Sequence, residues 1–493
     1  GEHGFCSPPF VLLQSRGKSP SLNSVIFRFL SFEVVSEKGF LLALAHFTSV
    51  VGAGFASGQE LLQYFTAFGI WGIVGAGVGL ILAPLTIMIA MQYGSYFQAT
   101  SHGRVFSSIA SKPVARLVDY AIIFTQFCHT FVMLSGGGAN LHQQWGWQPW
   151  VGSALMAVLV LIVGSMNVAK VTNVLGAITP FVLILLLLAV GAAFIDPPSG
   201  LQQAHEFASA HVESPLPFWW VATLNYLGLS LMASTAMSIV MGADTLNSRQ
   251  AGRGGFFGGL LFSGMLVLLV IALLLSVEDV WDADLPTLAM LNEIHPWLGT
   301  AAAVFIYLMI FSTAISNFYG MARRLSARRP NRYLPILVAS VIIAFVLSFV
   351  PFDTLVGMVF PILGYIGIIV IGLLIYTWLR RGRGIVNAES RRRDKIRGLI
   401  LRMIDPKQKF TTSDQSQLSR EVYNSNLSGT HLRDEVANDV IAELDDQESS
   451  PFHAEDYQLE KDWQKLDATR PPAERLRDPD TEHFHVPKKD NDR

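Results

Sequence analysis

The chain has 493 residues, of which 51% are hydrophobic and only 15% are charged, with 36 Lys and Arg against 38 Asp and Glu. Of these, 21 basic and 23 acidic residues fall in 380–493, so the rest of the chain is almost uncharged. This distribution excludes an ordinary soluble domain and indicates a polytopic membrane protein. The net charge of −2 averages two unlike regions, and two cysteines, Cys6 and Cys128, define neither a disulfide framework nor a zinc motif.

Residues 1–38 form a polar leader of mixed composition that lacks the charged, apolar and cleavage regions of a signal peptide. The leader begins with Gly rather than Met. We expect it to be disordered, or to be an artefact of cloning or of the assigned start site.

Apolar runs of about 17–25 residues predict membrane-spanning helices. Ten such runs lie within a core of residues 39–380, at about 40–68, 71–93, 117–138, 150–167, 171–194, 217–241, 256–277, 299–320, 334–350 and 354–379. The eleven Lys and Arg residues between 40 and 378 all lie after even-numbered spans. Because basic residues concentrate in cytoplasmic loops, we expect a protein of the cell membrane with both termini in the cytoplasm.

The first span carries the stretch SVVGAGFASGQE near its middle. A spanning helix is interrupted only where its backbone lines a cavity or is buried in protein, because unpaired backbone groups are costly in hydrocarbon. A break there leaves free carbonyl groups on one side, where a cation can bind, and free N–H groups on the other, where a carboxylate can bind. We predict a substrate site formed by Gly52, Ala53, Gly54, Phe55, Ser57 and Gln59.

The ten spans divide into two halves of five, at about 40–194 and 217–379, and an odd number of spans per half inverts the second half. Inverted repeats are typical of secondary transporters, whose substrates bind between discontinuous helices at mid-membrane. The sixth span, which contains TLNYLGLSLMASTAMS, corresponds to the first and is predicted to be broken too, with Asn225, Tyr226 and Ser230 at the site. Plain helix packing through small residues is the alternative for this span.

The ten-span pattern, the GAGFASGQE break, the seventh loop DLPTLAMLNEIHP and the segment FSTAISNFYG of the eighth span resemble the YkvI-type bacterial membrane proteins. These proteins are related to the amino acid-polyamine-organocation (APC) transporter superfamily. The resemblance covers about residues 38–380. It implies the five-plus-five inverted-repeat (LeuT-like) fold and cation-coupled transport of a small organic solute, without indicating which solute.

The resemblance also implies a sodium site made of carbonyl groups before the break and two hydroxyl groups of the eighth span. Carried over by position, its ligands are the carbonyls of Thr48, Val51 and Met309 and the hydroxyls of Ser312 and Thr313. Hard cations take oxygen ligands, which suits Na⁺. A Ser–Thr pair is also a common hydrogen-bonding pair between membrane helices, which is the alternative interpretation.

Ionisable side chains within spans mark ion or substrate paths. At a rise of about 1.5 Å per residue, Glu60 lies about 9 Å outward from Gly54 and is a candidate for gating or for carrying a coupling proton. A structural pairing of Glu60 with Gln126 or with a tyrosine inside the bundle is the alternative. In the third span, Gln126 and His129 share one face at three-residue spacing, and facing the first span they would line the substrate cavity. A histidine with a purely structural hydrogen bond is the alternative for His129.

The C-terminal region has two parts of opposite charge. Residues 381–409 are basic and carry apolar residues at helical spacing, which predicts an amphipathic juxtamembrane segment; membrane lipid is the expected partner of 380–409. Residues 410–493 hold ten basic and twenty acidic residues, and apart from a short helix near Leu432 to Leu444 we expect a mostly disordered cytoplasmic tail whose protein partners are unknown. An ordinary solvated tail is the alternative for both parts.

These features predict an all-α polytopic membrane protein that acts as a secondary active transporter, coupled to Na⁺ by symport. The expected substrate is an amino acid or another neutral or zwitterionic solute, because no Lys or Arg lies within the spans to meet a second carboxylate. Proton coupling and a non-transporting receptor on the same fold are the alternatives. No catalytic motif, and therefore no enzyme activity, is read from the loops, and we expect neither a cofactor nor a nucleic-acid partner.

Overall fold

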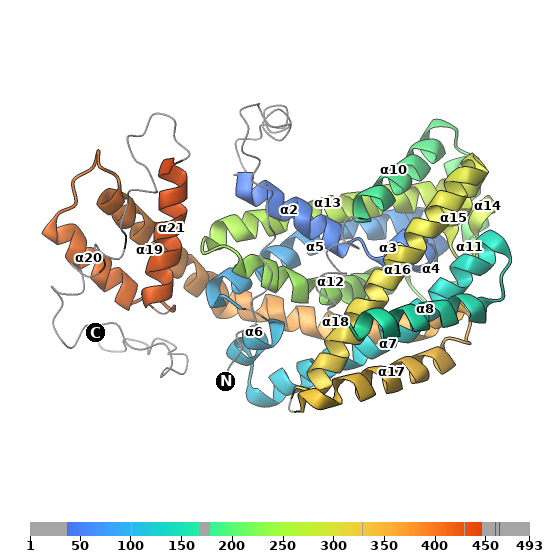
Figure 1. Cartoon of the computed structure of the whole chain (residues 1–493). Coiled ribbons are helices and arrows are strands. Elements are labelled where there is room, and N and C mark those ends of the chain that lie inside the picture. Colours follow the sequence, from blue (N-terminus) through green and yellow to red (C-terminus); the bar gives the residue numbers. More distant parts are fainter. Residues whose placement is uncertain are drawn as a thin grey trace. The chain divides into compact units, whose positions relative to one another are not determined.

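The computed structural model describes residues 37–99, 101–166, 178–327, 329–427 and 429–445, together with Leu459 and Trp463. Nearly all of the predicted leader lies outside these residues. Every regular element in the described ranges is a helix (Figure 1).

The predicted membrane spans form helices. Six of these are long and apolar enough to cross a membrane: α5 (Ile70–Phe97), α7 (Lys112–Trp145), α12 (Trp219–Ala243), α13 (Ser248–Leu275), α16 (Pro296–Leu325) and α18 (Phe352–Thr377), which continues beyond Thr377. Three apolar helices are shorter: α8 (Pro149–Gly164), α10 (Thr179–Ile195) and α17 (Tyr333–Leu347). The first span is divided into α2 (Glu37–Val50), α3 (Ala53–Ser57) and α4 (Gln59–Tyr64). These elements together occupy the ten predicted spans.

Shorter helices lie in the connections between spans. They are the 3₁₀ turn Thr66–Phe68, α6 (His102–Ile109), α11 (Leu201–His211), α14 (Val277–Val280), α15 (Pro286–Ile294) and the 3₁₀ turn Pro330–Arg332. The long seventh connection therefore contains two of them, α14 and α15, and α15 packs against α3 and α4 of the first span.

The chain divides into two compact units. The membrane unit comprises Gly1–Ile87, Ser111–Thr235 and Gly254–Leu373. The tail unit comprises Met88–Ala110, Ala236–Arg253 and Leu374–Arg493, so it includes the last residues of α5 and α12 as well as the C-terminal region.

In the membrane unit, small residues bring helices into close contact. A Cβ on Gly138 of α7 would meet the carbonyl oxygen of Pro149, and a Cβ on Gly152 of α8 would meet the backbone of Gly137 and Gly138. Helices pack tightly in membranes where glycine lets their backbones approach, because dispersion contacts replace the hydrophobic effect there. The α7–α8 pair, with α16 packed beside both, therefore forms a rigid part of this unit.

The break predicted for the sixth span is absent in the structure. All of Trp219–Ala243 is described, and it forms one uninterrupted helix, α12. Gly228 serves packing instead, since a Cβ there would meet the carbonyl oxygen of Gly364 in α18. The Thr235 hydroxyl donates to the Leu231 carbonyl of the same helix at 2.6 Å. The alternative noted for this span, helix packing through small residues, accounts for these contacts.

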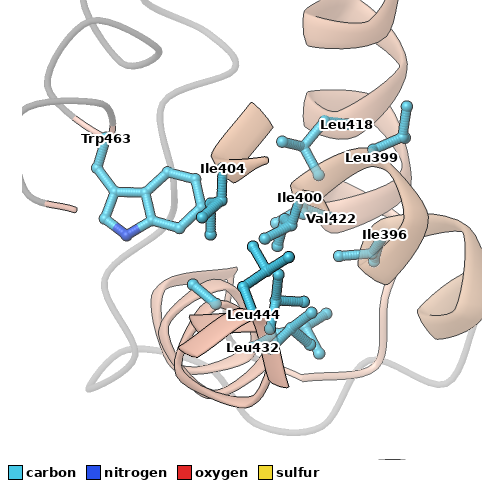
Figure 2. Close-up of a cluster of buried hydrophobic side chains, with 12 residues drawn as sticks. Ile396, Leu399, Ile400, Ile404, Leu418, Val422, Leu432, Leu444 and Trp463 are labelled. Atoms are coloured by element: carbon cyan, nitrogen blue, oxygen red, sulfur yellow. The ribbon is translucent and has the colours of Figure 1, made fainter. Parts of the chain in front are cut away.

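The tail unit contains three helices after a π-helical turn at Trp378–Gly382: α19 (Arg383–Ile404), α20 (Thr412–Tyr423) and α21 (Gly429–Asp445). Figure 2 shows their apolar side chains gathered into one cluster with Trp463. The cluster comprises Ile396, Leu399, Ile400, Ile404, Leu418, Val422, Leu432, Val436, Ala437, Val440, Leu444 and Trp463. Burying one large aliphatic side chain stabilises a fold by about 1.5–3 kcal/mol, so this cluster can hold three short helices together.

The structure therefore differs from the sequence-based view of the C-terminal region in two respects. The apolar face of α19, predicted to rest on lipid, packs against α20 and α21. Residues 412–423, within the range expected to be mostly disordered, form a helix, whereas the helix at 429–445 includes the short helix expected near Leu432 to Leu444. A capping box stabilises the start of α20, where Thr411 Oγ1 accepts from the Asp414 amide and the Asp414 carboxylate accepts from the Thr411 amide at 3.0 Å.

Candidate functional site

The first span is interrupted at two points. Val51 and Gly52 separate α2 from α3, and Gly52 is extended at φ −107° and ψ −172°. Gly58 separates α3 from α4 with φ +79°, a left-handed conformation that residues with a Cβ rarely adopt. Gly52 lies at the first interruption, as expected, whereas Gly54 lies within α3 and the second interruption is at Gly58.

Side chains take up some of the backbone groups that these interruptions release. The Ser57 hydroxyl donates to the Gly54 carbonyl at 2.9 Å and accepts from the Gln59 amide at 3.3 Å. From α15, the Thr287 hydroxyl donates to the Ala56 carbonyl. The first N–H groups of α3 have no partner within the helix, as at every helix N-terminus, so a polar surface of backbone remains at the break.

The carboxyl group of Glu60 lies at this break. Glu60 is only 8% exposed, and its carboxyl atoms occupy the space where a Cβ on Gly54 would lie. The expected separation of about 9 Å from Gly54 assumed a straight helix. It does not hold for the carboxyl group, because Gly58 turns the chain between the two residues. Among the described residues, no ion pair joins Glu60 to Lys or Arg.

Aromatic rings surround the two short helices of the first span. Phe55 of α3 packs against Phe262 of α13, with ring centroids 5.6 Å apart. Tyr226 of α12 contacts Tyr64 at 6.0 Å and Phe65 at 5.1 Å, the latter edge-on. Tyr226 is 1% exposed, and Ser230 of the same helix is half-buried. The first and sixth spans thus meet through these rings.

Several buried polar atoms of the first and sixth spans have no hydrogen-bond partner among the described residues. They include Oε1 of Gln59, the Tyr64 hydroxyl and Oδ1 of Asn225, whose amide nitrogen donates to the Pro361 carbonyl at 2.9 Å. Buried polar groups are almost always paired in native proteins, and each exception calls for an explanation.

The eighth span brings one predicted sodium ligand to the break. A methyl group on Gly52 would lie 3.7 Å from the Val50 carbonyl oxygen and 3.9 Å from Oγ1 of Thr313 in α16. Val51 and Met309 are buried, whereas the Ser312 side chain is half-buried. The side chains of Thr48 and Ala53 lie outside the described part of the structure. The structure thus juxtaposes Thr313 with the end of α2.

Gln126 and His129 make contacts away from the break. Gln126 lies against Gly320 of α16, and the His129 ring lies 5.4 Å from Phe360 of α18. Nδ1 of His129 is 3.0 Å from the Thr125 carbonyl of its own helix. These contacts match the structural alternative for His129 and do not place either residue against the first span.

Three residues of this region were not singled out from the sequence. Tyr64 lies four residues after Glu60 and shares its helix face, a spacing that signals proximity. His46 is a buried ionisable residue of α2 that contacts Gly258 of α13, and its position within an apolar span was a readable signal. Thr287 reaches Ala56 across 231 residues, and no local pattern indicates such a contact.

Comparisons with known proteins agree with this architecture. No protein-family model matches the chain. Two proteins of Bacillus subtilis (strain 168), the uncharacterized membrane protein YkvI and the uncharacterized protein YyaD, are each 24% identical over 341 residues, which make up 68% of this chain and 94% and 95% of the two relatives. The crystal structure of MhsT in complex with L-phenylalanine matches with a TM-score of 0.51 at 14% identity, covering 83% of this chain and 97% of MhsT.

The comparisons confirm the resemblance indicated by the GAGFASGQE break and the all-helical fold class. This chain is a multi-pass membrane protein similar to the YkvI-type proteins, with the LeuT-like five-plus-five helix fold that it shares with MhsT.

Proposed function

We propose that this protein is a secondary active transporter of a small neutral or zwitterionic organic solute, with the solute bound at the break of the first span. The observation that carries the proposal is that the broken first span holds two buried polar atoms without a partner in the described structure, Oε1 of Gln59 and the Tyr64 hydroxyl, and that Oδ1 of Asn225 in the neighbouring α12 is a third. Such groups stay unpaired in hydrocarbon only at a high cost, so a polar ligand that pairs them is favoured. The phenylalanine complex of MhsT is consistent with an amino acid-like solute.

We further propose that transport is coupled to Na⁺ between the end of α2 and Thr313. The close approach of Thr313 to Gly52 and the Val50 carbonyl supports this arrangement. Removing one neutral ligand should cost about 1–3 kcal/mol, or about 5- to 150-fold in sodium affinity. Thr313→Ala and Ser312→Ala should therefore shift the sodium dependence of uptake far more than Ser316→Ala, an exposed position on the same helix.

The experiment begins with a thermal-shift screen of amino acids, nucleobases and polyamines, with and without sodium. Uptake and counterflow of a solute that stabilises the protein are then measured in proteoliposomes. Binding without counterflow would identify a receptor on the transporter fold and contradict the transport proposal.

Proton coupling is the second candidate, and the position of Glu60 favours it. A buried carboxyl group at the break, with no Lys or Arg paired to it in the described structure, is a suitable proton carrier. Uptake that ignores sodium, follows a proton gradient and loses that dependence in Glu60→Gln would replace the sodium mechanism.

We propose the cell membrane as the location, with both termini in the cytoplasm, on the basis of the basic residues in alternate loops. Cysteines placed at the exposed positions Gln202 and Asp282 should react with an impermeant maleimide in intact cells, and one at exposed Ala327 should not. The reverse labelling pattern would overturn this topology.

A further inference from the structure

Arg393 of α19 is a buried arginine whose donor groups are all used. Its side chain is 3% exposed. Nη1 donates to the carbonyls of Ser95 and Leu246, each at 2.9 Å, and Nη2 donates to the Tyr96 carbonyl at 3.0 Å and to Oδ1 of Asn426 at 2.9 Å. Nε donates to the Glu389 carboxylate at 3.2 Å. The five N–H donors of a guanidinium are thereby all satisfied.

The carbonyl acceptors belong to two separate segments of the tail unit. Ser95 and Tyr96 lie in the last turn of α5, where carbonyl groups have no partner within the helix. Leu246 lies in the loop between α12 and α13. Arg393 therefore caps the end of α5 and at the same time holds the α12–α13 loop. We call this set of contacts the Arg393 clamp.

Neighbouring residues fix the clamp in place. The Glu389 carboxylate also accepts from Arg392 and from the Ser425 hydroxyl, both at 2.5 Å. Asn426 donates its amide to the Tyr96 carbonyl at 2.6 Å. A buried ion pair stays formed when additional hydrogen bonds satisfy its remaining groups, as they do here.

The α12–α13 loop is also held by apolar contact. The Leu246 side chain packs against the apolar cluster of α19, α20 and α21 that Figure 2 displays. Nearby, an exposed ion pair joins Arg249 of α13 to Asp394 of α19 at 3.3 Å. The C-terminal helices thus contact both the backbone carbonyl and the side chain of Leu246. The buried core of these helices is formed by other residues.

The two helix ends held by the clamp also contact each other directly. A Cβ on Gly94 of α5 would meet the Ile239 backbone of α12, and a Cβ on Gly242 of α12 would meet the Met91 backbone of α5. Movement of one end relative to the other would break hydrogen bonds of a buried guanidinium, which is costly because the charge is left unsatisfied. α12 is also the continuous helix that carries Asn225 and Tyr226.

We propose that the C-terminal helices α19–α21 form a docked regulatory domain whose Arg393 clamp restrains the ends of α5 and α12 and slows opening of the solute site toward the cytoplasm. The domain has its own apolar core, so it can leave its docking site as a body without unfolding. The proposal rests on the transporter function and orientation proposed above, because it assigns the clamp to a conformational cycle.

The test compares the full-length protein with Arg393→Gln, and with Arg391→Gln as the matched control, since Arg391 is exposed on the same helix. Hydrogen–deuterium exchange in lipid nanodiscs reports docking at residues 88–99 and 240–250. Opening is measured as the rate at which 2-aminoethyl methanethiosulfonate, added from the cytoplasmic side of inside-out vesicles, modifies a cysteine at Ser57 in a Cys6→Ser, Cys128→Ala background.

For Arg393→Gln we expect faster exchange in both segments and modification faster by about 10-fold or more, as for the loss of hydrogen bonds to a charged group. The control should match the parent protein. Unchanged exchange would overturn the clamp, and faster exchange with unchanged or slower modification would overturn the regulatory role. Because the modification rate needs no transport, failure of counterflow would count against the proposed function and leave this result intact.

A second variant guards against a folding defect in Arg393→Gln. Asn426→Ala removes one clamp partner and leaves the buried ion pair of Arg393 and Glu389 in place. We expect the same changes in the same direction, but smaller. No change in either measurement for this variant, in protein of normal abundance, would also contradict the proposal.

Discussion

The first and sixth spans have similar compositions and different structures. Both carry glycine and hydroxyl residues at mid-depth, yet the first is divided into α2, α3 and α4, while α12 is continuous. In the first span, Gly58 adopts φ +79°, and the Thr287 hydroxyl of α15 donates a hydrogen bond to the Ala56 carbonyl. In α12, Gly228 packs against α18 instead. Small residues therefore permit a break, but the surroundings that satisfy the backbone decide whether one forms.

Of the substitutions that test this comparison, Gly54→Leu in the first span should have the largest effect. The Glu60 carboxyl group fills the space beside Gly54, so the side chain in Gly54→Leu would displace it and occupy the break. We expect complete loss of the thermal shift produced by solutes that stabilise the parent protein. Gly77→Leu is the control, because a Cβ at Gly77 of α5 meets nothing within 4 Å. A normal thermal shift in Gly54→Leu would place the solute elsewhere.

A smaller effect is expected at the left-handed turn. In Gly58→Ala the alanine must adopt φ +79°, and its Cβ would lie 2.8 Å from Cγ2 of Thr287. Because both effects strain the folded state, the free energy of unfolding should fall by about 1–3 kcal/mol. The measurement is thermal unfolding in detergent, with Gly264→Ala in α13 as the control, since a Cβ there meets nothing within 4 Å. Equal midpoints for the two variants would show that Gly58 does not determine the break.

The smallest effect is expected in the sixth span. Thr235 is 2% exposed and its hydroxyl donates to Leu231 within α12, so Thr235→Val should change stability by about 0.6 kcal/mol or less. Thermal unfolding and solute-induced shifts check this expectation. If Thr235→Val abolished the solute-induced thermal shift at unchanged stability, Thr235 would take part in solute binding, contrary to this expectation.

The sequence predicts the parts of the fold that depend on local composition. Apolar runs give the spans, and Gly52, Gly54 and the following polar residues give the break, because hydrocarbon penalises unpaired backbone wherever it occurs. The loop charges predict an orientation that stays a prediction. Local sequence does not determine how a helix is rotated about its own axis. For this reason Gln126 and His129 of the third span are expected to face the first span but contact α16 and α18.

The sequence misses features that depend on contacts between distant residues. The position of the Glu60 carboxyl depends on the turn at Gly58, and the contact of Thr313 with Gly52 depends on the packing of α16. The sequence indicates a helix near Leu432 to Leu444 but neither α20 nor the shared core, because the average composition of 410–493 is polar, whereas a few residues such as Leu418, Leu432 and Leu444 suffice to form a core with α19.

The Arg393 clamp also has a consequence for the order in which the molecule is assembled. Arg393 is synthesised 298 residues after Ser95, the carbonyl of which it caps. At about 5–20 residues per second, a ribosome needs about 15–60 s to cover that distance. Throughout this time the Ser95 and Tyr96 carbonyls lack the guanidinium that caps them in the folded protein, and every remaining span is synthesised before the arginine. Closure of the clamp is therefore a late step of biogenesis, and a chain that terminates prematurely can never complete it.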